Sequence, residues 1–252
     1  MKLRKLGKSV ARAAILFSSV ICLPLMSGCE RAALPLDTEA GTNEKWQRPP
    51  VLETATWQGS NIVVSGVAEP FSRVVLAEAS GHVFASSSDS QGRFQIDLTV
   101  PAEGIYLKPR LQLGQEFVDG QGLVFLRPGQ DPLAVSLRDG EASYRLSHLG
   151  ALDAVDSDGS MVIISGHAQT TAVPKLRVDG QAMTIELDAL GHWAVAVQHT
   201  GGPLQIQLNE EAFTYPGVGR PESGVEFVSG GWRISRKIGD KAVQSTWLPV
   251  VK

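Results

Sequence analysis

The chain is poor in cysteine, modest in aromatic residues and without an excess of basic residues. Two cysteines in 252 residues exclude a disulfide-rich scaffold. The 23 Lys and Arg residues are outnumbered by 26 Asp and Glu residues, which argues against a strongly basic nucleic-acid-binding protein. The uncharged apolar run at residues 13–25 has thirteen residues, and a membrane-spanning helix needs about 20. These shortages leave a globular protein of modest length as the class to consider.

The remaining composition favours short strands. Hydrophobic residues make up 43% of the chain and charged residues 19%, a balance typical of globular rather than disordered proteins. The 26 glycines and 14 prolines favour many turns over long helices. Outside the N-terminal region, we find no amphipathic pattern long enough to predict a helix of about ten residues or more.

The N-terminus has the pattern of a secretory signal peptide. Residues 1–12 are basic and the apolar run 13–25 follows, ending in small residues before Cys29. The segment Leu25-Met26-Ser27-Gly28-Cys29 resembles the lipobox of bacterial lipoproteins, although Met26 stands where that family usually has Leu. The alternatives are an ordinary secretory signal and an uncleaved anchor.

The resemblance implies that residues 1–28 are removed and that Cys29 is lipidated, which would anchor the chain to a membrane. Removing the five basic residues of 1–28 leaves 18 basic against 26 acidic residues, a net charge of −8. Cys22 is lost with the signal, so no disulfide or cysteine-based metal site is expected afterwards. Glu30 follows the cysteine where retained inner-membrane lipoproteins of enteric bacteria carry Asp, so the same resemblance favours the outer membrane.

Residues 29–50 are expected to form the lipidated cysteine and a flexible tether. This segment shows no helical or strand periodicity and is punctuated by Pro, Gly and charged residues. Trp46 is expected to dock on the first folded domain. The tether would hold the folded part of the protein away from the bilayer.

An internal repeat organises the rest of the chain. Residues 59–66 (GSNIVVSG) match 159–166 (GSMVIISG), and residues 92–98 (GRFQIDL) match 191–197 (GHWAVAV). Residues 111–113 (LQL) align with 206–208 (IQL) in the same order. Three matches in one order at slowly changing offsets indicate duplication of a domain.

Each repeat reads as short strands separated by turns. Phe94, Ile96 and Leu98 alternate with polar residues, as in a half-buried strand, and Asp179-Gly180 is a typical two-residue hairpin turn. The pattern G-x-x-V-x-V-S-G-x-A followed by D-x-x-G-x-F-x-I/V resembles the Ig-like repeats of bacterial envelope proteins. The resemblance implies an all-β chain with two tandem Ig-like β-sandwich domains, at residues 51–150 and 151–252.

The second domain is expected to end in a three-strand β-meander over residues 225–250, with turns at Gly230-Gly231 and Gly239-Asp240. Its aromatic and basic residues form the candidate binding cluster: Trp232, Arg233, Arg236, Lys237 and Trp247. Core packing is the more common role of any one of these tryptophans, and the charges could be a solvated face.

The sequence shows no catalytic motif. The five histidines lack metal-site spacing, and no G-x-S-x-G nucleophile elbow is present. Asp153, Asp156 and Asp158 could chelate calcium, but a polar linker between the domains explains the same composition better. We therefore expect no catalytic residues, metal or cofactor.

The expected function is binding or scaffolding. A lipid-anchored envelope protein with Ig-like domains would bind another envelope protein through strand edges or the C-terminal meander. The alternative is a module that binds exopolysaccharide or peptidoglycan, which would need Trp232, Trp247 or Tyr215 on one exposed face. Nucleic acid is not an expected partner, and the protein is not expected to be an enzyme.

Overall fold

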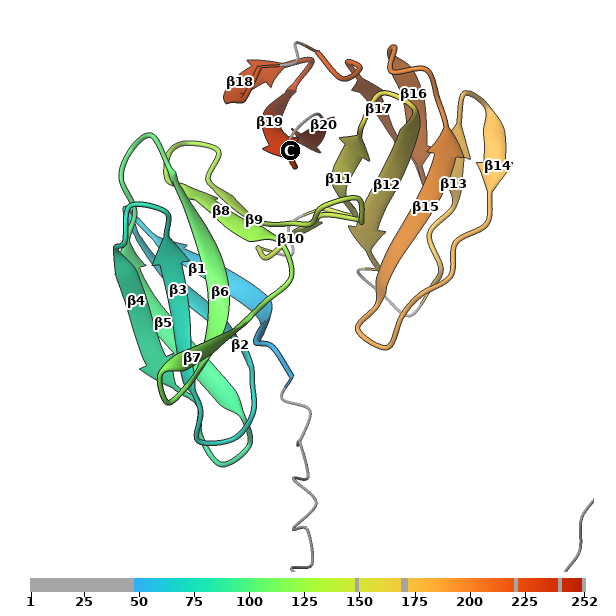
Figure 1. Cartoon of the computed structure of the whole chain (residues 1–252). Coiled ribbons are helices and arrows are strands. Elements are labelled where there is room, and N and C mark those ends of the chain that lie inside the picture. The colour runs from blue at the N-terminus through green and yellow to red at the C-terminus, as the bar shows by residue number, and fades with distance from the viewer. Residues whose placement is uncertain (1–47, 148–149, 169–171, 220–221, 240–241, 251–252) are drawn as a thin grey trace, which may run out of the picture. The chain divides into compact units, whose positions relative to one another are not determined.

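The structure is a computed structural model in which residues 48–147, 150–168, 172–219, 222–239 and 242–250 are described. The described residues all fall within one compact unit of the chain. They form only antiparallel sheets, with no helix in any of these ranges (Figure 1). The all-β prediction is therefore confirmed. The predicted signal peptide, Cys29, nearly all of the tether and Trp46 lie outside the described residues.

The first copy of the repeat comprises strands β1–β10, arranged in two sheets. Sheet A has the order β1 (Val51–Gln58), β2 (Asn61–Val67), β5 (Arg93–Thr99). Sheet B has the order β10 (Tyr144–Arg145), β9 (Leu133–Leu137), β8 (Leu123–Arg127), β6 (Ile105–Leu113), β3 (Arg73–Glu78), β4 (Val83–Ser87), and β7 (Glu116–Asp119) also pairs with β6.

The second copy comprises strands β11–β20, also in two sheets. Sheet C has the order β15 (His192–Gln198), β12 (Met161–His167), β11 (Leu152–Ser157), β20 (Ala242–Pro249), β19 (Gly231–Ile238), β18 (Gly224–Val228). Sheet D has the order β14 (Gln181–Met183), β13 (Leu176–Val178), β16 (Leu204–Leu208), β17 (Glu211–Tyr215).

Each copy has its own hydrophobic core between its two sheets, a sandwich-like arrangement. In β5, Phe94, Ile96 and Leu98 are buried while the residues between them are exposed, as the alternation predicts. They join residues of sheet B in the first core cluster. Trp193 of β15 and Trp247 of β20 contribute to the corresponding cluster of the second copy.

The sequence repeat is a structural repeat. Strands β1 and β2 pair with an irregularity between Leu52 and Thr54, and β11 and β12 have the same irregularity 100 residues later, between Leu152 and Ala154. Asp89 and Asp188 are also equivalent, because each Oδ1 accepts hydrogen bonds from the backbone N–H groups two and four residues ahead.

Glycine is required at the same place in both copies. A Cβ on Gly66 would lie 2.1 Å from the Val51 carbonyl oxygen and 2.9 Å from the Phe94 ring. A Cβ on Gly166 would lie 2.0 Å from the Ala151 carbonyl oxygen and 2.6 Å from the Trp193 ring. The small residue in each S-G pair therefore lets an aromatic ring cross the strand, which explains why the repeat contains both.

The two copies use one strand order but interrupt it at different places. In the first copy no ladder joins β1 to β10 among the described residues; Ala55 N–H of β1 donates a 2.8 Å hydrogen bond to the carbonyl of Leu146, the residue after β10. In the second copy the equivalent neighbours β11 and β20 form a regular ladder that includes Val155 and Trp247. Conversely, β8 pairs with β6 in the first copy, whereas the equivalent strand β18 pairs only with β19 among the described strands.

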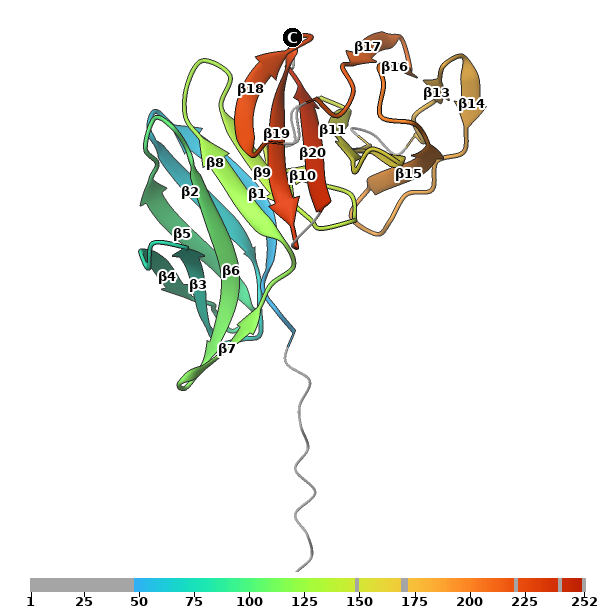
Figure 2. The ribbon, with the colours of Figure 1, turned by 45° about the horizontal axis from the view of Figure 1, so that its top comes forward.

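Strands β18, β19 and β20 lie side by side as a three-strand C-terminal meander (Figure 2). Its first turn is Ser229-Gly230, one residue earlier than expected, and both residues have positive φ. The sequence did not reveal that β20 pairs with β11, which makes the meander part of the larger sheet C.

Candidate functional site

The candidate cluster predicted from the sequence lies on β19 and β20, but most of it is buried. Arg233, Arg236 and Trp247 are 7%, 8% and 1% exposed, Trp232 is half-buried, and Lys237 is exposed. Successive residues of β19 point to opposite faces of sheet C. The cluster is therefore divided between two faces, and its role in binding stays a prediction.

Arg233 and Trp247 stabilise the second copy from within. The Arg233 guanidinium contacts the Glu226 carboxylate at 2.7 Å and donates a 2.9 Å hydrogen bond to the Gly217 carbonyl. Trp247 packs in the second core, where its indole N–H donates to the Val228 carbonyl at 3.0 Å. Tyr215 is also fully buried there, and burial raises its pKa to about 12.

Trp232 and Arg236 face the first copy. The Arg127 guanidinium lies over the Trp232 ring, 4.0 Å from its centroid. Arg236 forms an ion pair with Asp139 and donates to the Gln244 side chain at 3.3 Å. These contacts place Trp232 and Arg236, two of the five residues of the predicted cluster, at a junction between the two copies.

An apolar cluster forms one part of this junction. Residues of β8 and β9 pack with residues of β11, β19 and β20, and Trp232 packs against them. The buried residues of this junction cluster are Phe125, Leu133, Val135, Leu137, Ala154, Ile234 and Leu248. Both copies therefore bury apolar surface against each other in addition to their own cores.

A buried polar network centred on Asp156 forms the second part of the junction. The Asp156 carboxylate accepts hydrogen bonds from Ser143 N–H at 2.7 Å, Ser143 Oγ at 2.8 Å, Gln244 Nε2 at 3.0 Å and Thr246 Oγ1 at 2.5 Å. Burial raises the pKa of Asp156, and these hydrogen bonds oppose the rise. Gln244 continues the network by donating to the Arg138 carbonyl at 2.9 Å.

A second buried polar group, centred on Asp153 of β11, lies beside the Asp156 network. Asp153 Oδ1 lies 3.0 Å from His167 Nδ1, and Asp153 is fully buried. Arg145 of the first copy donates to the Asp153 and Pro249 carbonyls. Burial lowers the pKa of Arg145 to about 10, although the Asp153 charge acts in the opposite direction.

The preferred interpretation of the aspartate triplet as a polar linker is therefore wrong. Asp153 and Asp156 are buried strand residues of β11. The Asp156 carboxylate accepts hydrogen bonds from the distant residues Gln244 and Thr246, and Asp153 Oδ1 lies against His167 Nδ1. Asp158 is exposed and bonds to the backbone N–H groups of Ser160 and Met161 in the following turn, which lowers its pKa. In the described part of the chain, no group of three or more His, Cys, Asp or Glu residues could hold a metal ion.

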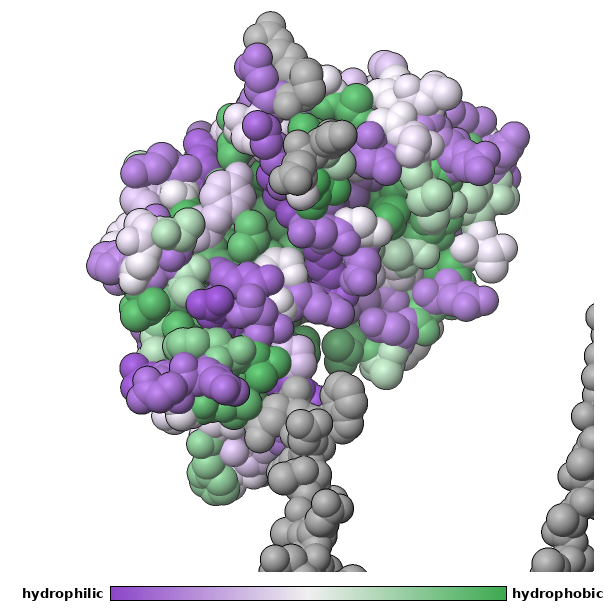
Figure 3. Space-filling model, viewed as in Figure 1, coloured by the Kyte–Doolittle hydropathy of each residue, from purple (hydrophilic) through white to green (hydrophobic). Residues whose placement is uncertain are grey.

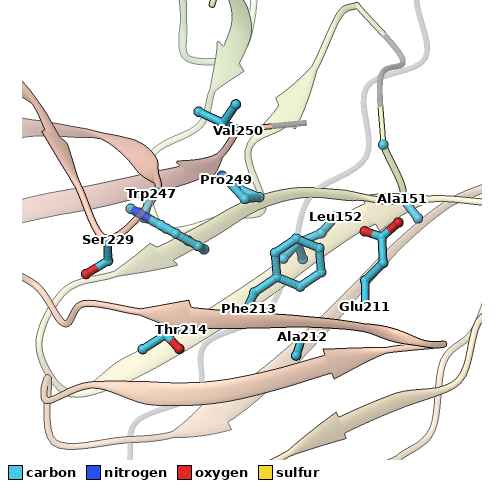
Figure 4. A pocket seen from close by; sticks show the side chains of 12 residues that line it. Ala151, Leu152, Glu211, Ala212, Phe213, Thr214, Ser229, Trp247, Pro249 and Val250 are labelled. Carbon is cyan, nitrogen blue, oxygen red and sulfur yellow. The ribbon is translucent and has the colours of Figure 1, made fainter. Parts of the chain in front are cut away.

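A cavity of about 470 Å³ opens into the second copy between β17 and the ends of β11 and β20 (Figure 4). Leu152, Phe213 and Trp247 supply apolar and aromatic surface. Glu211 and Ser229 supply polar atoms at its lining. The size and mixed lining suit part of a ligand or a side chain of a partner.

On the face of the molecule shown in Figure 3, the described residues form no broad apolar patch that would offer another binding site. Figure 3 shows hydrophilic and hydrophobic residues interspersed there. The most exposed large apolar side chains are Phe71, Leu190, Val83 and Phe227, at 77%, 64%, 56% and 55%. Among these four residues, only Phe227 lies on the edge strand of the meander, β18. Val228 separates it from the turn at Ser229 and Gly230, which lines the cavity.

Comparison of this chain with protein-family models and with curated proteins gives no match. Across the ranges that the structure describes, no helix has the length and apolar character required to cross a membrane. The site must therefore be judged on its own geometry. The sequence indicated Trp232 and Arg236, which lie at the junction, but it missed Ser143, Gln244 and Thr246, which carry no recognisable motif.

Proposed function

We propose that this chain is a non-enzymatic, lipid-anchored protein of the bacterial cell envelope, in which two tandem Ig-like β-sandwiches bind or scaffold another envelope component. The lipobox-like segment ending at Cys29 supports the anchor. The sandwich-like packing of each copy and the shared bulge support the Ig-like assignment.

One observation carries the binding role: the buried junction joins the copies into one body. Asp156, Arg145 and Arg236 all contact residues of the other copy. Charged groups that could have served chemistry are thus used to fix the two copies together. A fixed pair of sandwiches presents its edges and loops at constant spacing, which lowers the entropic cost of binding a large partner.

The anchor is tested by membrane fractionation and palmitate labelling of the full chain. Cys29→Ser should abolish labelling and release the protein from membranes, because acylation requires the thiol. Cys22→Ser is the matched control and should leave both unchanged. Retention of Cys29→Ser on membranes until detergent is added would contradict the anchor.

The binding role is tested by crosslinking in intact envelopes, comparing wild type with variants of exposed edges. Deleting residues 221–252 is unsuitable because β20 pairs with β11 inside sheet C. A binding protein should give a discrete crosslinked product that depends on a surface residue. A chain that gives none at any exposed edge would contradict the proposal.

Polysaccharide binding ranks second. Tyr215 and Trp247 are buried, and Arg127 lies over the Trp232 ring, so these rings do not form one exposed stacking face. The cavity beside Phe213 is the observation that favours a sugar. Titration with defined peptidoglycan fragments, using Phe213→Ala as the variant, separates this function from protein binding.

A further inference from the structure

The two copies differ at one strand edge: β8 pairs with a strand on each side, whereas the equivalent strand β18 pairs on one side among the described strands. In the first copy β8 lies between β9 and β6, and the β6 contacts are Ile105 with Leu126, Tyr106 with Phe125 and Leu107 with Val124. In the second copy β16 begins only at Leu204, and the preceding residues 199–203 are not a strand. The N-terminal part of β6 therefore has no counterpart, and the outer edge of β18 is left without a ladder among the described residues.

The hairpin geometry shows which groups point outward from that edge. Ser229 and Gly230 have φ of 50° and 69°, the signature of a type I′ turn, and Val228 and Gly231 close it. The closing pair of such a turn is hydrogen-bonded, and bonded positions alternate along an antiparallel ladder. The N–H and C=O groups of Val225 and Phe227 therefore point away from β19.

The side chains at this edge favour one kind of occupant. Phe227 is 55% exposed and contacts the Trp232 ring, with centroids 5.2 Å apart. Val225 packs at the margin of the junction cluster, on the same face. Beyond Val228 the edge reaches Ser229 and Gly230, which line the cavity. An added strand would thus meet apolar surface on one face and a cavity at its end.

We propose that β18 accepts an extended segment of a partner polypeptide, which adds to sheet C as an antiparallel strand. The partner residues opposite Val225 and Phe227 are apolar or aromatic, because both side chains lie on the junction face of sheet C, where Tyr106 of β6 is opposite Phe125 of β8 in the first copy. A second copy of this chain fits poorly. Pairing two β18 strands about their centre places Glu226 opposite Glu226, and like charges directly across a ladder are unfavourable.

The proposal deepens the proposed binding function and rests on it for the existence of a partner. The capacity of the edge itself can be tested without that partner. The probe is the segment Gly104–Lys108 (GIYLK), which contains the start of β6, fused after Lys252 through a Gly/Ser linker. Val250 N–H bonds to the Gly230 carbonyl, so the chain leaves β20 beside the turn from which an antiparallel strand along β18 would start.

The linker must cross three strand spacings, about 14 Å, which about six residues can span. Amide hydrogen exchange is measured on the full chain with and without the fusion. The fused strand should slow exchange at Val225 and Phe227 by about tenfold or more, because their N–H groups become hydrogen-bonded. A donor with proline at its Ile and Leu positions should give no slowing while leaving the acceptor unchanged.

Phe227→Pro removes the outward N–H without removing a β18–β19 hydrogen bond, and should abolish the slowing at Val225. Phe117→Pro is the matched control, because Phe117 occupies the outward position of β7, next to the Leu113–Glu116 closing pair. Unchanged exchange at Val225 and Phe227, or equal slowing with the proline donor, would overturn strand addition. Neither result would contradict the anchor at Cys29 or binding at another edge.

Discussion

Replacing Asp156 by alanine tests the junction at its most connected residue. The substitution removes an acceptor of four hydrogen bonds and leaves the Ser143 N–H and one Gln244 N–H without a partner. Each buried unsatisfied donor costs about 1–3 kcal/mol, whereas the Ser143 and Thr246 hydroxyls can rotate. Removal of a buried carboxylate returns part of this cost, so we expect a net loss of about 3–4 kcal/mol.

Urea unfolding followed by tryptophan fluorescence measures this loss. Asp158→Ala is the matched control, because Asp158 is exposed and bonds only within its turn, and we expect a loss of about 1 kcal/mol or less. Equal losses for the two variants would refute the different roles assigned to these neighbouring aspartates. An Asp156→Ala protein as stable as wild type would refute the network.

The same residue predicts a pH dependence. The pKa of Asp156 is raised on folding, so its protonated form favours the folded state. Its contribution is complete below the unfolded pKa, about 3.9, and is lost as pH rises through the folded pKa. The stability advantage of wild type over Asp156→Asn should therefore shrink as the pH rises above about 4. A widening gap would contradict the direction.

Two further predictions concern the repeat and the basic cluster. Gly66→Ala and Gly166→Ala should each destabilise the protein by about 2–4 kcal/mol, because a Cβ meets a carbonyl and an aromatic ring in both copies; thermal unfolding compares them with Gly202→Ala, where a Cβ meets nothing within 4 Å. Arg236→Met should lower the unfolding free energy by about 2–3 kcal/mol because Asp139 and Gln244 lose their partner, whereas Lys237→Met at an exposed position should change it by less than about 0.5 kcal/mol. Similar values for the glycine variants and their control, or for the two basic residues, would contradict these assignments.

The strands could be predicted because their signals are local. Alternation at Phe94, Ile96 and Leu98 and the Asp179-Gly180 turn each depend on residues a few positions apart. The duplication was visible for the same reason. In the structure it extends to the hairpin after Leu113 and its counterpart after Leu208, which the sequence match at 111–113 only suggested.

The junction could not be predicted because its partners are far apart in the chain. From the sequence, Asp156 is interpreted as a linker residue. In the structure it is buried and accepts a hydrogen bond from the hydroxyl of Thr246, 90 positions away. From the sequence, Arg236 could be a solvated charge. In the structure it forms an ion pair with Asp139, 97 positions away. A charged side chain can be buried only where such partners compensate its charge, and composition does not show which distant residues will become partners.

The central claim is that the two copies form one body. ¹⁵N relaxation on residues 48–252 measures the rotational correlation time of each copy separately. The junction predicts the same correlation time for β1–β10 and β11–β20, and Asp156→Ala should make the two diverge if it opens the junction. Two distinct and shorter correlation times in the wild-type protein would contradict the claim.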